Sequence, residues 1–466
     1  MKSVKFFAAG APAILPLFAV VVISFLAIGT TASAQSTFTW SGGGGNLQWN
    51  SINNWTNGAA PASGSTNTFV FAGVAKPTNN NNVNNLTMNA LLFSTNATAF
   101  VLRGNAVSLI GGITNNSANT QTINLAAITN NITNTIDAAS NNIVINAAIV
   151  GTGGITKAGA GTLILGTNNS YSGATTISGG TLLLSNAGTI STNALNLSAS
   201  GATLNISNIT ATTVNVASIT GATGSTVSLG SKNMSFGGNN ASTTFAGAIT
   251  GSGNLTKNGT GTTTLSGANT YTGSAIVSAG TLKLENATGS ALGSITNVSV
   301  STGAILLVAQ SDQVNNSAAV TLSGGTIRRG GNVSEVFGNL NLTTGSFLDY
   351  GAANDPGTIR FGTYTPSSLL TVQNFLPGNK LQFGNTITDA DLNNAALFSF
   401  SSPWTTSTEG GFFTITAIPE PSTVLAAVGL VGLMLWPSRR RLVKDAKRVL
   451  GLRAPMRDRL AALRDS

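Results

Sequence analysis

The ionisable side chains are the first place to look for chemistry, because the sequence contains no cysteine and no histidine. Cysteine nucleophiles, Ser-His-Asp triads and imidazole metal ligands are therefore excluded. Between Gln35 and Ile418 the chain holds nine Asp or Glu residues, and Asp349 and Asp355 form an isolated pair among them. Enzymes that cleave polysaccharides work through converging carboxylates, and no such cluster is evident. We predict no catalytic residue, no bound cofactor and no enzymatic activity.

One acidic segment, Asp389-Ala-Asp391-Leu-Asn393, has the spacing of oxygen ligands that opens a calcium-binding loop. Asn394 stands where that loop needs glycine, and Phe400 stands where it needs the last glutamate. The segment fits better as the start of a short helix that Thr388 caps. We therefore predict no metal ligand here.

Two lysines, Lys157 and Lys257, lie in glycine-rich surroundings that could suggest a phosphate-binding loop. Such a loop ends in Gly-Lys-Ser or Gly-Lys-Thr, and neither tripeptide occurs in this sequence. We interpret the glycines as turn residues. The lysines are expected to be exposed charges at strand edges, where they would keep the protein soluble and block lateral pairing.

The net charge of +9 does not belong to the body of the protein. Residues 439–466 contain ten Lys or Arg and three Asp, whereas residues 35–418 contain ten basic and nine acidic side chains. A nucleic-acid-binding domain needs a basic face on the folded domain itself. We therefore predict no nucleic acid partner.

The first 34 residues have the three parts of a secretory signal peptide. Lys2 and Lys5 precede an apolar run over 6–29, and Ala32-Ser33-Ala34 follows as a small-residue cleavage site. We predict export through a secretion translocon and cleavage between Ala34 and Gln35. Because the apolar run is longer than usual, an uncleaved N-terminal anchor is the alternative.

The other end of the chain has a motif, a short apolar segment and a basic cluster, in that order. Pro419-Glu420-Pro421 precedes apolar residues 424–436, and Arg439, Arg440 and Arg441 follow. The apolar segment is short for a membrane span of ~20 residues, but flanking arginines can snorkel and the bilayer can thin. By the positive-inside rule the arginines remain cytoplasmic. We expect a single transmembrane helix that anchors the precursor in the inner membrane.

This arrangement closely resembles the PEP-CTERM sorting signal of Gram-negative-type bacteria. The resemblance implies that an exosortase-like membrane transpeptidase reads residues 419–441 and passes the protein to the cell surface or the extracellular matrix. Residues 442–466 would form a basic cytoplasmic tail. Apolar residues recur in this tail at roughly helical spacing, so it is either an amphipathic helix on the anionic inner leaflet or a disordered extension.

The body of the chain contains a repeat with an offset of 100 residues. Residues 151–184 and 251–284 coincide at their glycines, one lysine, one tyrosine and their leucines. The shared positions are Gly151, Gly153, Lys157, Gly159, Gly161, Tyr171, Gly173, Gly180, Thr181 and Leu182, and the same residue types 100 positions later. Self-similarity at a fixed period is typical of repeat architectures.

Short strands with alternating apolar and polar residues fill the repeats and continue outside them. Clusters of Gly, Asn and Ser separate the strands and supply tight turns. A strand this short cannot bury a face alone, but strands stacked ~4.8 Å apart align their leucines, isoleucines and valines into one continuous core. The pattern predicts an all-β fold, a right-handed parallel β-helix with about 20 residues per turn and roughly 15 turns.

The repeat resembles the autotransporter-associated β-strand repeat in its segments Gly153-Gly-Ile-Thr-Lys157, Tyr171-Ser-Gly173 and Gly180-Thr-Leu182. The resemblance implies an exported β-solenoid, displayed on the surface or held in the matrix, and often adhesin-like. We expect three regions within the body: an N-terminal cap over 35–95, the solenoid over 96–345 and a C-terminal β-rich cap over 346–418.

Aromatic residues mark two further places in the body. Trp40, Trp49 and Trp55 either close the end of the solenoid as a hydrophobic cap or form an exposed platform for stacking sugars, and the cap is favoured. Tyr171 and Tyr271 occupy equivalent turn positions, about five turns of the solenoid apart, and are expected to pack those turns.

These observations favour an exported, non-enzymatic β-solenoid of the cell envelope or extracellular matrix that acts as an adhesin or scaffold. Its expected partner outside the cell is exopolysaccharide or a cell-surface glycan. A glycan- or ice-binding β-helix is the second hypothesis, with ranks of threonine such as Thr262-Thr263-Thr264 as the binding face. A polysaccharide-acting enzyme is the least favoured.

Overall fold

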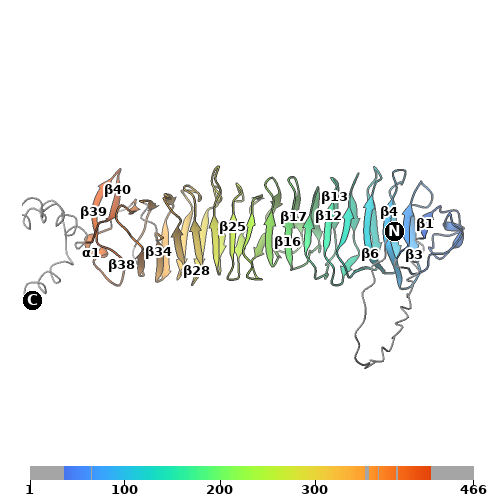
Figure 1. Cartoon of the computed structure of the whole chain (residues 1–466), viewed down its shortest axis with the longest axis horizontal. Coiled ribbons are helices and arrows are strands. Elements are labelled where there is room, and N and C mark those ends of the chain that lie inside the picture. Colours follow the sequence, from blue (N-terminus) through green and yellow to red (C-terminus); the bar gives the residue numbers. More distant parts are fainter. Residues whose placement is uncertain (1–35, 65, 352–355, 366, 385–386, 421–466) are drawn as a thin grey trace, which may run out of the picture. The chain divides into compact units, whose positions relative to one another are not determined.

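The computed structural model describes residues 36–64, 66–351, 356–365, 367–384 and 387–420. Within these residues the chain is almost entirely β-structure, with forty short strands, one 3₁₀ turn, η1 (Ile52–Asn54), and one short helix, α1 (Asp389–Leu392). Nearly all strand pairs are parallel, and most consecutive strands of the chain belong to different stacks, which repeat along the coil (Figure 1). The predicted all-β parallel solenoid is therefore confirmed.

The longest stack, the first column, follows one side of the coil through seventeen parallel strands. In stacking order they are β1 (Thr37–Trp40), β2 (Thr68–Phe71), β4 (Leu86–Phe93), β6 (Val107–Asn115), β9 (Asn134–Asp137), β12 (Ile155–Ala158), β14 (Thr175–Ile177), β16 (Ala194–Leu197), β19 (Ser218–Gly221), β22 (Thr243–Phe245), β25 (Thr262–Leu265), β27 (Thr281–Leu284), β29 (Ile305–Val308), β31 (Thr326–Arg329), β34 (Ser346–Asp349), β36 (Leu370–Gln373) and β38 (Phe398–Phe400). β8 (Ala127–Asn130) and β11 (Ala148–Val150) stack beside this column on β6.

Two further columns and a terminal sheet complete the coil. The second column contains β3 (Thr78–Asn81), β5 (Val101–Gly104), β7 (Gln121–Leu125), β10 (Ile143–Ile145), β13 (Thr162–Leu165), β15 (Thr181–Asn186), β17 (Thr203–Ile209), β20 (Thr226–Ser228) and β23 (Ala248–Thr250). The third contains β18 (Thr213–Asn215), β21 (Asn233–Phe236), β24 (Leu255–Lys257), β26 (Ala275–Val277), β28 (Asn297–Ser301), β30 (Ala319–Ser323) and β33 (Leu340–Thr344). The terminal sheet contains β32 (Glu335–Phe337), β35 (Thr358–Phe361), β37 (Lys380–Phe383), β39 (Trp404–Glu409) and β40 (Phe412–Ala417).

The alternation of apolar and polar residues explains how each short strand adds to the core. Leu163, Leu182 and Leu204 pair in register from turn to turn along the second column, and all three are fully buried. On each strand, the residues that alternate with these leucines are partly exposed. Burial of one such side chain contributes about 2 kcal/mol, so a strand of four residues is stable only through its neighbours in the adjacent turns.

The two copies of the repeat lie on different sides of the coil. From β12 the first column leads through β14, β16 and β19 to β22 in four turns, and β24 follows two columns later. An offset of 100 residues therefore equals four and two-thirds turns. The equivalent strands β12 and β24 belong to the first and third columns, although their sequences match.

The N-terminal end of the coil is covered by the segment between β1 and β2. Thr56 donates its backbone N–H to the Thr39 oxygen at 2.9 Å, and Trp49 donates to the Asn80 oxygen at 3.0 Å. These bonds occupy the outer edges of β1 and β3, which would otherwise invite pairing with another chain. Trp40, Trp49 and Trp55 are buried in this end, so the hydrophobic cap predicted from them is confirmed.

The C-terminal end is closed by antiparallel pairing. β39 and β40 form a hairpin, and β40 also pairs antiparallel with β37. Helix α1 begins as the sequence predicts, because the Thr388 side chain accepts from the Asp391 N–H and the Asp391 carboxylate accepts from the Thr388 N–H. Both ends of the parallel stack are thus finished by elements that do not continue it.

The predicted signal peptide over 1–34 and the predicted span over 424–436 lie outside the described residues. Among the described residues, no helix is long and apolar enough to cross a membrane.

Replacement of Trp49 by alanine tests the hydrophobic cap. The Trp49 ring is fully buried, stacks on Phe69 with 5.8 Å between ring centroids, and donates its indole N–H to the Asn79 side chain at 2.7 Å. We expect Trp49→Ala to lower the free energy of urea unfolding by about 4 kcal/mol. Ile52→Ala, at a neighbouring side chain that is 51% exposed, is the control and should cost less than about 0.5 kcal/mol. Equal effects of the two variants would contradict the cap.

Candidate functional site

The residues predicted to carry sorting fall at the edge of the described structure. Ile418 donates its N–H to the Pro403 oxygen at 3.0 Å, directly after β40, and Pro419 and Glu420 are exposed beyond it. Pro421 lies outside the described residues. So do Ala34 and Gln35 at the predicted cleavage site and Arg439, Arg440 and Arg441 of the basic cluster.

Lys157 and Lys257 are buried, so the prediction of exposed edge charges is wrong. Lys157 is 0% exposed, and its Nζ donates to the backbone oxygens of Ala158, Gly159 and Gly179 at 2.7, 2.9 and 3.0 Å. Gly159 and Gly179 belong to successive turns of the coil. The ammonium group therefore joins two turns at a corner of the coil, where only the Ala158 oxygen also accepts a backbone N–H, from Ala138 at 3.0 Å.

The second copy repeats this arrangement. The Nζ of Lys257 donates to the backbone oxygens of Asn258, Gly259 and Ala279 at 2.6, 2.8 and 3.2 Å. A glycine is required beside each lysine: Gly180 has φ +58°, and a Cβ there would lie 2.5 Å from the Gly159 oxygen that Lys157 binds. The glycines and the lysine of the repeat thus form one unit, which we call the lysine corner.

The register shows why these lysines point inward. Lys157 pairs with Ile136 on one side and with Ile177 on the other, within a ladder of buried isoleucines. A signal for this was present in the sequence, because Lys157 stands two residues after the inward-facing Ile155 on the same strand.

Burial changes the acidity of these groups. It lowers the pKa of Lys157 to about 8, against the opposing attraction of the Asp137 carboxylate. Burial also lowers the pKa of Lys257.

The turn tyrosines pack as expected. Tyr171 is buried, and its hydroxyl forms a hydrogen bond of 2.8 Å with Thr175, while burial raises its pKa to about 12. Tyr271 is buried at the equivalent place. Beside each tyrosine an asparagine side chain, Asn169 or Asn269, accepts a backbone N–H from the preceding turn at 2.8 Å. Amide side chains therefore replace strand pairing where the chain forms a loop.

The threonines named for a binding face do not form one. Thr263 and Thr264 are buried, and Thr263 stacks in register on the inward-facing Leu282. Four other threonines, all partly exposed, stack on successive turns of the second column. They are 19–23 residues apart in the sequence, so no short motif indicates this ladder. These are Thr162, Thr181, Thr203 and Thr226.

The carboxylates do not assemble into a reactive group. Asp349 is nearly buried, and it accepts from Arg328 Nε at 2.6 Å and from the Asn374 amide at 2.7 Å. Asp355, its neighbour in the sequence, lies outside the described residues. Over the ranges that the structure describes, no three acidic side chains lie close enough to hold a metal ion.

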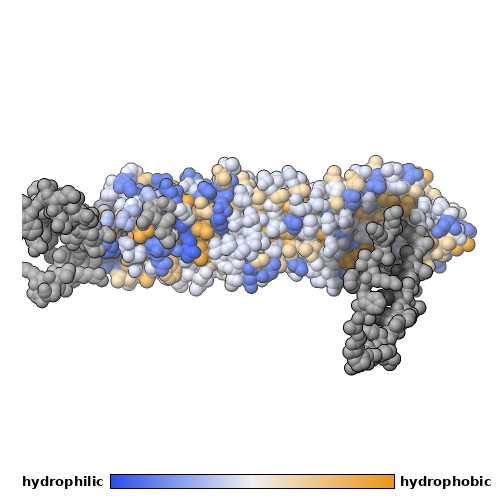
Figure 2. Space-filling model, in the orientation of Figure 1, coloured by the Kyte–Doolittle hydropathy of each residue, from blue (hydrophilic) through white to orange (hydrophobic). Residues whose placement is uncertain are grey.

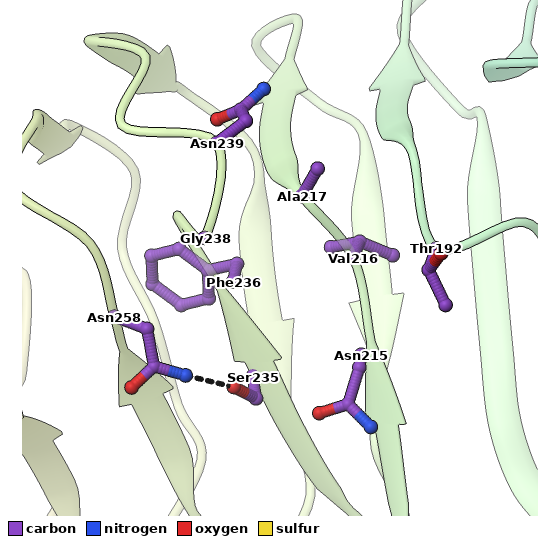
Figure 3. Close-up of a pocket in the computed structure, with 9 residues that line it drawn as sticks. All are labelled: Thr192, Asn215, Val216, Ala217, Ser235, Phe236, Gly238, Asn239 and Asn258. Atoms are coloured by element: carbon purple, nitrogen blue, oxygen red, sulfur yellow. Dashed lines mark hydrogen bonds between the residues drawn. The ribbon is translucent and has the colours of Figure 1, made fainter.

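A groove on the side of the coil is the feature that sequence reasoning missed. The third column begins only at β18, so residues 166–174 and 187–193 of the two preceding turns cross that side as loops without strands. Two hollows of about 370 and 380 Å³ lie there and share Thr192 and Ala217. Figure 3 shows the first of them, with amide side chains around Val216 and Phe236.

Two similarities to known proteins were found, one to a repeat family and one to an adhesin. Both repeats match one family model. That model describes the passenger-associated-transport-repeat, and it matches residues 155–184 and 255–284. These segments contain the lysine corners, the turn tyrosines and the strands from β12 to β15 and from β24 to β27.

A curated relative extends the likeness beyond the repeats. The adhesin BmaC autotransporter of Brucella suis biovar 1 (strain 1330) is 29% identical to this chain over 246 residues. The match covers 50% of this chain and 7% of the adhesin, so the chain spans a small part of that protein's length.

Removal of the Lys157 side chain tests the lysine corner. In Lys157→Ala the carbonyl groups of Gly159 and Gly179 lose the Lys157 donor, whereas Ala158 keeps the Ala138 N–H, and we expect the free energy of unfolding at pH 7 to fall by about 3 kcal/mol. Lys283→Ala is the control, because the Lys283 side chain is partly exposed and its ammonium group bonds only to the Glu285 carboxylate. The control should change stability by less than about 0.5 kcal/mol. Equal stabilities of wild type and Lys157→Ala would refute the corner.

Titration of Lys157 gives an independent test. Between pH 8 and the unfolded value of about 10.4 the unfolded chain binds more protons than the folded chain, so this lysine makes the unfolding free energy rise with pH. We expect the Cε resonance of Lys157 in the ¹³C-lysine spectrum, assigned with Lys157→Met, to titrate at about pH 8. A midpoint at or above 10.4 would show a solvated ammonium instead.

Proposed function

We propose that this chain is an exported, non-enzymatic β-solenoid that acts at the cell surface or in the extracellular matrix as an adhesin or scaffold. The similarity to an autotransporter adhesin over half of the chain carries the proposal. The structure adds support, because Lys157 joins two successive turns and Tyr171 packs within its own turn, so both side chains have structural roles. The middle of the visible face of the coil is mostly pale in hydropathy, with hydrophobic and hydrophilic patches toward its two ends (Figure 2).

Sorting is the second part of the proposal. Export begins with a signal peptide over 1–34, cleaved between Ala34 and Gln35, and ends with a PEP-CTERM signal over 419–441. A transmembrane helix anchors the precursor in the inner membrane, and an exosortase-like transpeptidase releases it to the surface. The exposed position of Pro419 and Glu420, just after the closing hairpin, suits cleavage that leaves the fold intact.

Exopolysaccharide or a cell-surface glycan is the partner that we propose outside the cell. The outer surface in the described ranges has few charges, since most exposed positions are Asn, Ser, Thr and Gly. Such a surface forms hydrogen bonds with hydroxyl groups without attracting polyanions.

A variant of the sorting motif tests this function in the native host. We expect the wild-type chain in the surface or matrix fraction, with an intact mass that starts at Gln35 and ends near Pro419. Glu420→Ala should accumulate in the inner membrane, and its cells should adhere to surfaces as weakly as cells that lack the protein. Glu285→Ala, a partly exposed glutamate outside the motif, is the control and should localise as wild type does.

Two results would contradict the proposal. A wild-type product that stays at full length in the inner membrane would show that the C-terminal segment is a permanent anchor. Normal adherence of cells that lack the protein would show that it is neither adhesin nor scaffold.

A further inference from the structure

The groove runs from the first copy of the repeat to the second and crosses five successive turns. Its lining comes from 169–172, 190–193, 215–217, 235–239 and residue 258. Neighbouring parallel strands are ~4.8 Å apart, so five levels extend over about 19 Å along the coil. The two hollows share Thr192 and Ala217, so they adjoin along the coil.

The lining carries hydrogen-bonding groups and no charge. Asn, Ser and Thr provide its polar atoms, and none of the side chains in either hollow is acidic or basic. Tyr171 is the single ionisable group in the lining, and burial raises its pKa to about 12, so it stays neutral. A charged ligand would find no partner here.

Several of these polar groups are available to a ligand. The side chains of Asn215 and Thr192 are exposed and make no hydrogen bond within the described ranges. The Asn258 amide nitrogen donates to Ser235 Oγ at 2.6 Å, which fixes the side chain with its oxygen available (Figure 3). The Asn239 amide nitrogen donates to Ser218 Oγ at 3.3 Å and its oxygen accepts from the Ala241 N–H at 3.1 Å, so this side chain is held at both ends.

Apolar atoms lie between these amides. Val216 and Phe236 form the floor of the first hollow, and Ile190 lies in the second. Ala217 is fixed by its backbone, which donates to the Asn193 oxygen at 3.1 Å and accepts from the Gly237 N–H at 3.0 Å. Alternation of amides with an apolar floor matches a pyranose ring, which has hydroxyl groups at its rim and C–H groups on its faces.

We propose that this groove binds an uncharged polysaccharide chain along the axis of the coil. The inference rests on the proposed surface function and names its ligand class. An extended peptide fits less well, because strand addition needs a long open edge and β18, which borders the groove, has three residues.

Calorimetric titration of the full chain with defined sugars tests the groove. The probes are cellohexaose, xylohexaose, mannohexaose and laminarihexaose as neutral chains, with hexagalacturonate as the acidic comparison. We expect at least one neutral hexasaccharide to bind and hexagalacturonate not to compete for that site. Affinity for the neutral chain should be the same at low and high salt, because no charge takes part.

Two groove variants and one matched control locate the binding. Asn215→Ala should weaken binding about tenfold, as expected for one lost hydrogen bond to a desolvated partner, and Ala217→Leu should fill the groove and abolish it. Asn341→Ala is the control, because Asn341 is also exposed, lies in the same third column and makes no side-chain hydrogen bond in the described part of the chain. Unfolding midpoints of the three variants verify that each one folds.

Several results would overturn the groove proposal. They are the absence of binding to all four neutral chains, unchanged affinity in both groove variants, or binding of hexagalacturonate alone with an affinity that falls with salt, which would show a charge-driven site instead. Equal binding of a twelve-residue Gly-Ser peptide would identify strand addition to β18 instead. Each of these results leaves localisation and adherence untouched, so failure of the groove and failure of the surface function are separate outcomes.

Discussion

Backbone carbonyl and N–H groups at the corners of the coil must find partners in a neighbouring turn, since each unpaired buried group costs 1 kcal/mol or more. Strands of three to five residues satisfy only part of these groups. Side chains supply the remaining bonds: the ammonium of Lys157 binds three carbonyls, the Asn169 amide takes an N–H from the preceding turn, and the Glu335 carboxylate accepts from two successive N–H groups. The stacking of the columns depends on these corners.

This constraint explains what the two copies of the repeat have in common. They share a lysine, the glycines that bring carbonyls to it, and a tyrosine with its neighbouring asparagine, and all of these groups join turns. Because the copies are four and two-thirds turns apart, their outer surfaces face different sides. The shared residues of the repeat are therefore structural. The groove that we describe runs from the loop of the first copy, at Tyr171, to Asn258 of the second.

The sequence predicts the parallel coil and the tryptophan cap because both depend on local patterns. Period-two alternation identifies the strands, and Trp40, Trp49 and Trp55 stand close together near one end. The burial of Lys157 was not predicted, because the charge of a lysine side chain favours exposure while its place on the strand favours burial. Lys157 follows Ile155 at the spacing of inward-facing residues, and that spacing was the better guide.

The groove could not be predicted in the same way. Its lining is drawn from five turns that are about 20 residues apart, and it exists because residues 187–193 form no strand on the third side. No short sequence motif indicates that residues 187–193 lack a strand. The register of the columns, which only the folded chain shows, brings Thr192 next to Asn215.

Native-state amide hydrogen exchange on the full chain tests the central claim, that corner contacts between turns hold the coil. The account predicts slow exchange at the Gly161 N–H, which bonds to the Ala138 oxygen at 2.8 Å, and at the Ile249 N–H, which bonds to the Asn269 side chain at 2.8 Å. Both should exchange with the buried strands of their own copy. Exchange at these two amides as fast as at the exposed Gly45 would contradict the account.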